Sequence, residues 1–457
     1  MQSNIRRRVL NGLGANLYNQ VVTVAVQLLT VPILLSSWGT EAYGEWLILY
    51  AVPGFLAMAN LGFSMSAGND MTAKVARGDR SGALRVFQSL AALLYVIALS
   101  GMMLCGALLW WLPLGEWFRF QTMSIEAIRW VLWLLAAQVF LQLLDGVTHA
   151  GFRANSQYAR HVAFQATTRL LQFGGIWLAA ILGGGPVAAA GAFLGVRLLT
   201  TPLFALVLVL RHRWLSFGVS HASTHELRRL YRPALANMAI PLGNALNLQG
   251  MVLVVGAVLG PVAVVVFATL RTLTRLALQM ILVVSRAAEP ELASAYGAGN
   301  AALMKSLYVH ALRGGLWLSL LAVLGLALLG TPILEVWTQA KVPMNDALFG
   351  WLLASAVATT LWNSPLAVLR AANRHLRAAA VFVLAATTAV GAAWLLLRMT
   401  GDLSYAGMAL LLMDGLMALY VLSAAARLAG VDWPQTLLTA MNPLPIARFL
   451  SRRMGLR

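Results

Sequence analysis

Residues 86–112 read VFQSLAALLYVIALSGMMLCGALLWWL, a run without a single charged side chain. A helix that crosses a bilayer needs about 20 mainly apolar residues, so this run is long enough to span one. The whole chain has the same character, because 60% of its 457 residues are hydrophobic and only 11% are charged. Soluble domains carry about 25% charged residues. The sequence therefore predicts a protein that lies mostly within a membrane.

Similar apolar runs recur along the chain. The first follows Arg6, Arg7 and Arg8 as a signal peptide's would, but it is too long and lacks a cleavage site of small residues. We therefore expect an all-α polytopic membrane protein with twelve transmembrane helices, near residues 15–36, 43–66, 86–112, 127–148, 162–183, 187–210, 234–257, 261–284, 312–334, 348–368, 378–398 and 405–427.

The Lys and Arg residues that give the net charge of +18 lie mostly in the loops between these runs. With the amino terminus inside, 25 of the 33 Lys and Arg residues fall on the cytoplasmic side and four fall outside. This asymmetry satisfies the positive-inside rule and predicts that both termini are cytoplasmic. In a soluble protein such a net charge would indicate nucleic-acid binding. Here the orientation of the chain in the membrane explains the positive charges, so we expect no nucleic-acid partner.

Signs of catalysis are missing from the sequence. Cys105 is the only cysteine, and no Walker A, HExxH or GxSxG pattern occurs. We expect neither an enzyme nor a bound metal or cofactor. A membrane-embedded polymerase or ligase is the alternative class, and it would need a large outer loop bearing Arg and His, whereas the predicted outer loops are short.

The segment 211–233, RHRWLSFGVSHASTHELRRLYRP, divides the predicted spans six and six. Two segments of the first half match segments of the second at an offset of about 219 residues, which predicts two pseudo-symmetric lobes. A duplicated transporter is one interpretation, and a duplicated scaffold without transport is the other. The matches are ARGDRSGAL (76–84) on AYGAGNAAL (295–303), which places Asp79 opposite Ala298, and FRANSQYAR (152–160) on LRAANRHLR (369–377).

The predicted division is an amino-terminal lobe of six helices, a basic cytoplasmic linker, a carboxy-terminal lobe of six helices, and a cytoplasmic amphipathic tail. Their bounds are 1–211, 212–233, 234–429 and 430–457. The tail is expected to lie on the anionic inner leaflet, because its apolar and basic residues fall on different sides of a helix.

Polar residues recur at helical spacing inside several spans, and the first span carries a stripe of six: Asn16, Asn19, Gln20, Thr23, Gln27 and Thr30. Such residues are costly in lipid and usually face a bundle interior or a water-filled space. We predict a shared hydrated cavity, while hydrogen bonding between helices is the alternative. The candidate cavity residues are Asn16, Gln20, Gln27, Gln165, Asn244 and the four intramembrane arginines Arg169, Arg197, Arg271 and Arg275.

Arg271 and Arg275 lie one helical turn apart, with no acid close in the sequence. Guanidinium groups match phosphate oxygens well, so an anionic ligand is expected between them. The competing account is a structural salt bridge from Asp145 or Asp414 to one of the arginines. Asp145, Asp414 and Glu45 are the candidates for coupling to an ion.

The opening of the chain resembles Wzx-type polysaccharide flippases of the multidrug/oligosaccharidyl-lipid/polysaccharide (MOP) superfamily. The resemblance rests on Asn16, Asn19 and Gln20 in the first span, on Pro32, and on diffuse motifs elsewhere. These motifs are WGTEAYGEWLIL (38–49), NLGFSMSAGND (60–70) and LRAANRHLRAA (369–379).

The resemblance implies a MATE-like fold whose two lobes surround a cavity that opens alternately to each side. It also implies that undecaprenyl-pyrophosphate-linked oligosaccharide is flipped to the outer leaflet of the bacterial inner membrane, for O-antigen, exopolysaccharide or capsule. Membrane lipid and the polysaccharide polymerase machinery are then candidate partners. A MATE-type drug/cation antiporter is the alternative, and the excess of intramembrane arginines over acids disfavours it.

Overall fold

A computed structural model describes residues 2–56, 61–114, 120–287 and 289–442. Within these ranges the chain is helical throughout and contains no strand, which confirms the predicted all-α class. The helices are α1 (Gln2–Leu56), α2 (Leu61–Ala76), α3 (Arg80–Trp111), α5 (Ile125–Ala154), α6 (Tyr158–Ile181), α7 (Pro186–Arg211), α8 (Thr224–Ala245), α9 (Met251–Leu259), α10 (Pro261–Ala287), α11 (Glu289–Gly297), α12 (Ala301–Thr338), α13 (Asp346–Ala371), α14 (Leu376–Thr400), α15 (Ser404–Ala429) and α16 (Trp433–Met441).

Ten stretches of the described chain are long and apolar enough to cross a membrane. One of them, Leu10–Leu56, combines two helices that meet at Gly39, whose φ of 77° lies outside the helical region. Helix α6 is not among the ten, although it covers the predicted span 162–183. When the two parts of α1 are counted separately and α6 is included, the described helices overlap all twelve predicted spans, although residues 57–60 of the predicted span 43–66 lie outside the described residues.

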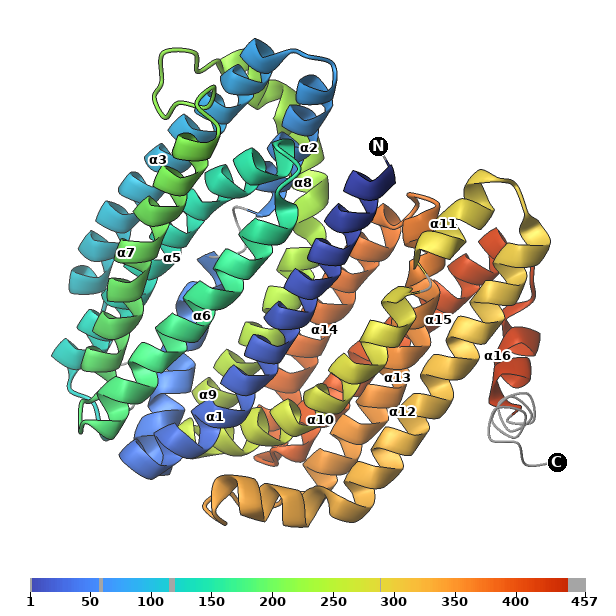
Figure 1. The fold of residues 1–457 in the computed structure, drawn as a ribbon. Coiled ribbons are helices and arrows are strands. Elements are labelled where there is room, and N and C mark those ends of the chain that lie inside the picture. Colours follow the sequence, from blue (N-terminus) through green and yellow to red (C-terminus); the bar gives the residue numbers. More distant parts are fainter. Residues whose placement is uncertain (1, 57–60, 115–119, 288, 443–457) are drawn as a thin grey trace. The chain divides into compact units, whose positions relative to one another are not determined.

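The chain divides into two compact units, residues 1–265 and 266–457. In the first unit α1 packs along α6, α5 along α7, and α2 along α8, as the neighbouring ribbons in Figure 1 show. In the second unit α13 packs against α12 and α15, and α14 packs against α15. The lobe boundary at the 212–233 linker stays a prediction. Most of the predicted tail, 443–457, lies outside the described residues, and α16 occupies its start.

The turns at Gly78 and Gly299 support the predicted repeat and correct the alignment of its first matched segment. Gly78 and Gly299 both have positive φ, and each precedes a residue whose side chain caps the next helix. Asp79 accepts a hydrogen bond from the backbone N–H of Gly82, and Asn300 accepts one from that of Leu303. The structural counterpart of Asp79 is therefore Asn300. The predicted counterpart, Ala298, was wrong by two positions because short alanine-rich segments align ambiguously.

A second pair of turns supports the other predicted match. Ser156 and Asn373 both adopt φ near 57°, at 58° and 56°. The residue after each donates its backbone N–H to the carbonyl five positions earlier, Gln157 to Phe152 and Arg374 to Leu369, both at 2.8 Å. A left-handed residue in this place closes the end of a helix. The two halves thus share local geometry at two separate turns.

Helix α8 begins at Thr224, inside the predicted linker 212–233, and continues through a π-helical turn into α9. Pro241 lies inside α8. The five residues that follow the end of α8, Leu246–Gly250, form a π-helical turn called η2, and α9 begins directly after it. Single π-turns inside α-helices are frequent at functional sites. Gly62 of α2 permits close packing here, since a Cβ at Gly62 would lie 2.2 Å from the carbonyl oxygen of Ala234.

Candidate functional site

The first unit contains a cavity of about 250 Å³. Helices α1, α5, α6 and α7 and the π-turn η2 all contribute to its wall. Glutamine, arginine and aromatic side chains dominate the lining, which consists of Tyr50, Pro53, Gly54, Leu135, Gln138, Val139, Gln142, Gln165, Arg169, Gln172, Phe173, Phe193, Arg197 and Gln249. Three predicted site residues, Gln165, Arg169 and Arg197, therefore meet at one cavity.

Asp145 of α5 is the centre of a buried hydrogen-bond network beside this cavity. It forms a salt bridge with Arg197 of α7, and both side chains are only 4% exposed. Asp145 also accepts hydrogen bonds from the Gln165 amide at 3.1 Å and the Thr201 hydroxyl at 3.0 Å. The second terminal nitrogen of Arg197 donates to the Gln172 side-chain oxygen at 3.1 Å. Asp145 and Arg197 thus form a salt bridge of the kind that the sequence left as the alternative account, and they neutralise each other.

Arg169 of α6 is bonded differently. Its Nη1 donates to the Thr23 hydroxyl at 2.7 Å and to the Asn19 side-chain oxygen at 3.3 Å, and both acceptors are neutral groups on α1. Among the described residues no carboxylate forms an ion pair with it. Arg169 is half-buried at the cavity wall. Its positive charge is therefore held by hydrogen bonds and left uncompensated.

The polar stripe of α1 is only partly directed at the cavity. Asn19 and Thr23, which hold Arg169, belong to the stripe predicted from the sequence. Its candidate Asn16 is exposed, whereas Gln20 and Gln27 are half-buried. The remaining candidate in the first unit, Asn244 of α8, is exposed. These four residues do not line the 250 Å³ cavity.

In the second unit, Arg271 and Arg275 lie on α10, as predicted. Arg271 is buried, and its guanidinium carbon lies 5.4 Å from the centre of the Phe267 ring. Arg275 is half-buried. Asp414 of α15 accepts hydrogen bonds from the Trp362 indole at 2.9 Å and from the Ser355 hydroxyl, and it lies within electrostatic range of Arg271. An acid distant in sequence thus acts on Arg271.

Glu45, the third acid predicted to couple to an ion, is fully buried and holds a loop. It accepts hydrogen bonds from the backbone N–H groups of Gln121 and Thr122, at 2.7 and 2.9 Å, and from the Thr122 hydroxyl. These contacts fix the segment that leads into α5. Among the described residues, no group of three His, Cys, Asp or Glu side chains could hold a metal ion.

Sequence reasoning did not single out several residues of the cavity wall. Tyr50, Phe173 and Phe193 form an aromatic cluster with ring centres 5.6 to 6.5 Å apart. Gln249 reaches the wall because it lies in the π-turn. The aromatic residues resemble ordinary core residues in the sequence. For Gln249, the only available signal was a polar residue soon after Pro241 within an apolar run.

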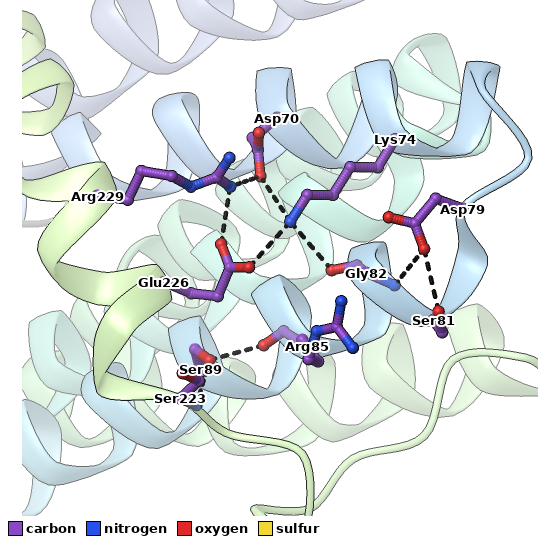
Figure 2. A network of polar contacts seen from close by, with 10 residues as sticks. All are labelled: Asp70, Lys74, Asp79, Ser81, Gly82, Arg85, Ser89, Ser223, Glu226 and Arg229. Carbon is purple, nitrogen blue, oxygen red and sulfur yellow. Dashed lines mark hydrogen bonds and ion pairs between the residues drawn. The ribbon is translucent and has the colours of Figure 1, made fainter.

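A second polar network joins the ends of α2, α3 and α8, and Figure 2 shows it from close by. Asp70 forms salt bridges with Lys74 and Arg229, and Glu226 forms salt bridges with the same two cations. Farther along, the backbone N–H of Ser223 donates to the Ser89 hydroxyl at 2.8 Å. Asn237 donates to Ser66 at 3.1 Å, which adds a contact between α8 and α2. We call Asp70, Lys74, Glu226 and Arg229 the α2–α8 clasp.

At the edge of this network the backbone N–H of Gly82 and the Ser81 hydroxyl lower the pKa of Asp79, because both stabilise its carboxylate. At the end of α7, burial lowers the pKa of His212, and the nearby Arg160 and Arg211 lower it further. Its Nε2 is buried without a hydrogen-bond partner. His212 is therefore held in its neutral form.

Comparison with known proteins identifies the fold. The sequence matches no protein-family profile and no curated protein. Solved structures do match, and one is an inward-facing multidrug resistance MATE family transporter of the MOP superfamily, with a TM-score of 0.73 at 17% identity over 90% of this chain and 96% of that one. An outward-facing MATE family transporter gives 0.63 at 17% identity over 93% and 97%. A MOP superfamily transporter from Pyrococcus furiosus, described as having a binding pocket of reversed polarity, gives 0.57 at 16% over 90% and 96%. The chain therefore has a MATE-like fold, as predicted.

Proposed function

We propose that this protein is a membrane transporter that works by alternating access and moves an anionic, lipid-linked oligosaccharide from the inner to the outer leaflet. The expected cargo is undecaprenyl-pyrophosphate-linked oligosaccharide for surface polysaccharide. The expected location is the bacterial inner membrane, with both termini in the cytoplasm. The general part of the proposal is supported by the similarity to MATE and MOP transporters over at least 90% of the chain.

The charge of the first-unit cavity is the observation that carries the cargo class. Among the described residues, Asp145 is the only acid bonded to its lining, and Arg197 neutralises that acid. Arg169 adds a positive charge without a carboxylate partner, so the wall favours an anion over a cation. In the second unit, Arg271 and Arg275 can bind a pyrophosphate through paired N–H groups.

The second candidate is a drug/cation antiporter. It is favoured by the matched structures, two of which are described as multidrug resistance transporters. An exporter of cationic drugs would need an unpaired acid in its cavity to bind the drug. Asp145 is paired with Arg197, so it attracts a cation only weakly.

A deletion strain separates the two functions. Surface glycan is measured by immunoblot, and susceptibility is measured against a panel of cationic drugs. The flippase proposal expects glycan to disappear, lipid-linked glycan to accumulate on the inner leaflet, and drug susceptibility to stay unchanged. Normal glycan with increased drug susceptibility would replace the proposal with the antiporter.

A further inference from the structure

The cavity of the first unit has an unbalanced charge. Two guanidinium groups, of Arg169 and Arg197, line it, and one carboxylate, of Asp145, contacts that lining. Because Asp145 is bonded to Arg197, a single positive charge remains, and it lies on Arg169. An uncompensated charge within a membrane is costly unless water or a ligand of opposite charge meets it. This favours an occupant with one negative charge.

Arg169 is positioned to reach such an occupant. Both of its hydrogen bonds to the protein leave from Nη1, toward α1. A guanidinium group carries five N–H donors, so the donors on Nη2 and Nε remain for a ligand. Nε of Arg197 is buried without a hydrogen-bond partner. Nη2 and Nε of Arg169 are not buried in this way. Arg169 therefore has donors at the surface of the cavity, whereas the Arg197 side chain is almost completely buried.

The rest of the wall suits a ring that carries hydroxyl groups. Four glutamine side chains, Gln138, Gln142, Gln165 and Gln249, supply amide donors and acceptors that can bond hydroxyls in several orientations. The amide of Gln172 is already bonded to Phe193 and Arg197. The cluster of Tyr50, Phe173 and Phe193 adds aromatic faces that can cover the apolar face of such a ring. A volume of about 250 Å³ is small, equal to roughly eight water molecules.

We infer that this cavity is a subsite for one acidic sugar, a polyhydroxylated ring with a single carboxylate, which Arg169 binds. The inference rests on the proposed function, because the sugar would belong to the transported oligosaccharide. A pyrophosphate group carries more than one negative charge and has no hydroxyl ring, so it matches this wall poorly. The subsite thus binds the glycan and does not bind the pyrophosphate group.

Binding to the purified full-length protein tests the inference, with D-glucuronate as the probe and D-glucuronamide as its uncharged counterpart. Isothermal titration calorimetry should show that glucuronate binds about ten- to a hundredfold more tightly, the range expected for a charge-assisted hydrogen bond. Arg169→Gln should abolish this preference, and Arg169→Lys should retain part of it. Arg398→Gln removes an exposed arginine of the second unit and should leave it unchanged.

Three results would overturn the subsite: no binding of glucuronate, equal binding of the amide, or a preference that survives in Arg169→Gln. Displacement of glucuronate by inorganic pyrophosphate that depends on Arg169 would also overturn it. Failure here is distinct from failure of the proposed function. If deletion abolishes surface glycan but glucuronate does not bind, only the subsite is wrong. If glucuronate binds as expected but deletion leaves glycan intact, the transport proposal is wrong.

Discussion

Arg197 of α7 donates a hydrogen bond to Asp145 of α5, across 52 residues of chain and with both side chains almost completely buried. Removing one partner of a buried pair leaves the other charge uncompensated. We expect Arg197→Ala to lower the free energy of unfolding by about 3–5 kcal/mol. The double variant Asp145→Ala/Arg197→Ala should be less destabilised than the sum of the single variants. Thermal unfolding of purified protein in detergent measures this, and strictly additive effects would show that the two charges do not interact.

The arginine pair of α10 should matter for export more than for folding. Arg271→Ala and Arg275→Ala are expected to reduce surface glycan in a deletion strain while the protein is still produced, and lysine at either site should be partly tolerated because it keeps the charge but loses the paired N–H groups. Arg398→Ala serves as the matched control. If an alanine variant restores the full amount of surface glycan, that arginine is not essential for transport of the cargo.

The α2–α8 clasp should open during transport if access alternates. In a Cys105→Ala background, Asp70→Cys and Arg229→Cys place two thiols where a salt bridge now joins α2 to α8. Cross-linking them is expected to stop glycan export, and reduction should restore it, because α8 could no longer part from α2. Each single cysteine is the control for the lost charge. Continued export by fully cross-linked protein would show that this contact is static.

His212 should make stability depend on pH. Its lowered folded-state pKa means that the unfolded chain binds a proton first as the pH falls below the ordinary value of 6.5. Stability is therefore present above pH 6.5 and is lost as the pH decreases through the range below it. His212→Gln should weaken this loss relative to the parent protein, as measured by thermal unfolding between pH 7 and 5, a range set around the usual histidine pKa. Identical pH profiles would exclude His212 as the source.

Topology can be tested with single cysteines in the same Cys105→Ala background. A cysteine at His225, within the segment 211–233, should resist an impermeant thiol reagent added to intact cells, because the charge asymmetry places that segment inside. A cysteine at the exposed Lys341, on the predicted outer side, should react and thus provides the positive control. Labelling of position 225 from outside would show that the predicted orientation is wrong.

Hydropathy and spacing predicted the helices well because a membrane requires long apolar runs, and the described helices follow these runs. The polar stripe of α1 was also informative, since Asn19 and Thr23 do contact an intramembrane arginine. Partners were harder to predict. Nothing local in the sequence states that Asp145 pairs with Arg197, or that Glu45 holds the loop at Gln121. The π-turn that brings Gln249 to the cavity has no sequence signature of its own.

The corrected repeat sets Asp79 of the first half against Asn300 of the second. The turn requires only an oxygen that accepts a hydrogen bond, and either side chain supplies one. A duplicated gene can therefore change the charge at this site without losing the fold. On the predicted inner side of the membrane, anionic lipids repel the carboxylate of Asp79 and are indifferent to the amide of Asn300. We therefore expect the two turns, alike in backbone, to interact differently with lipid headgroups.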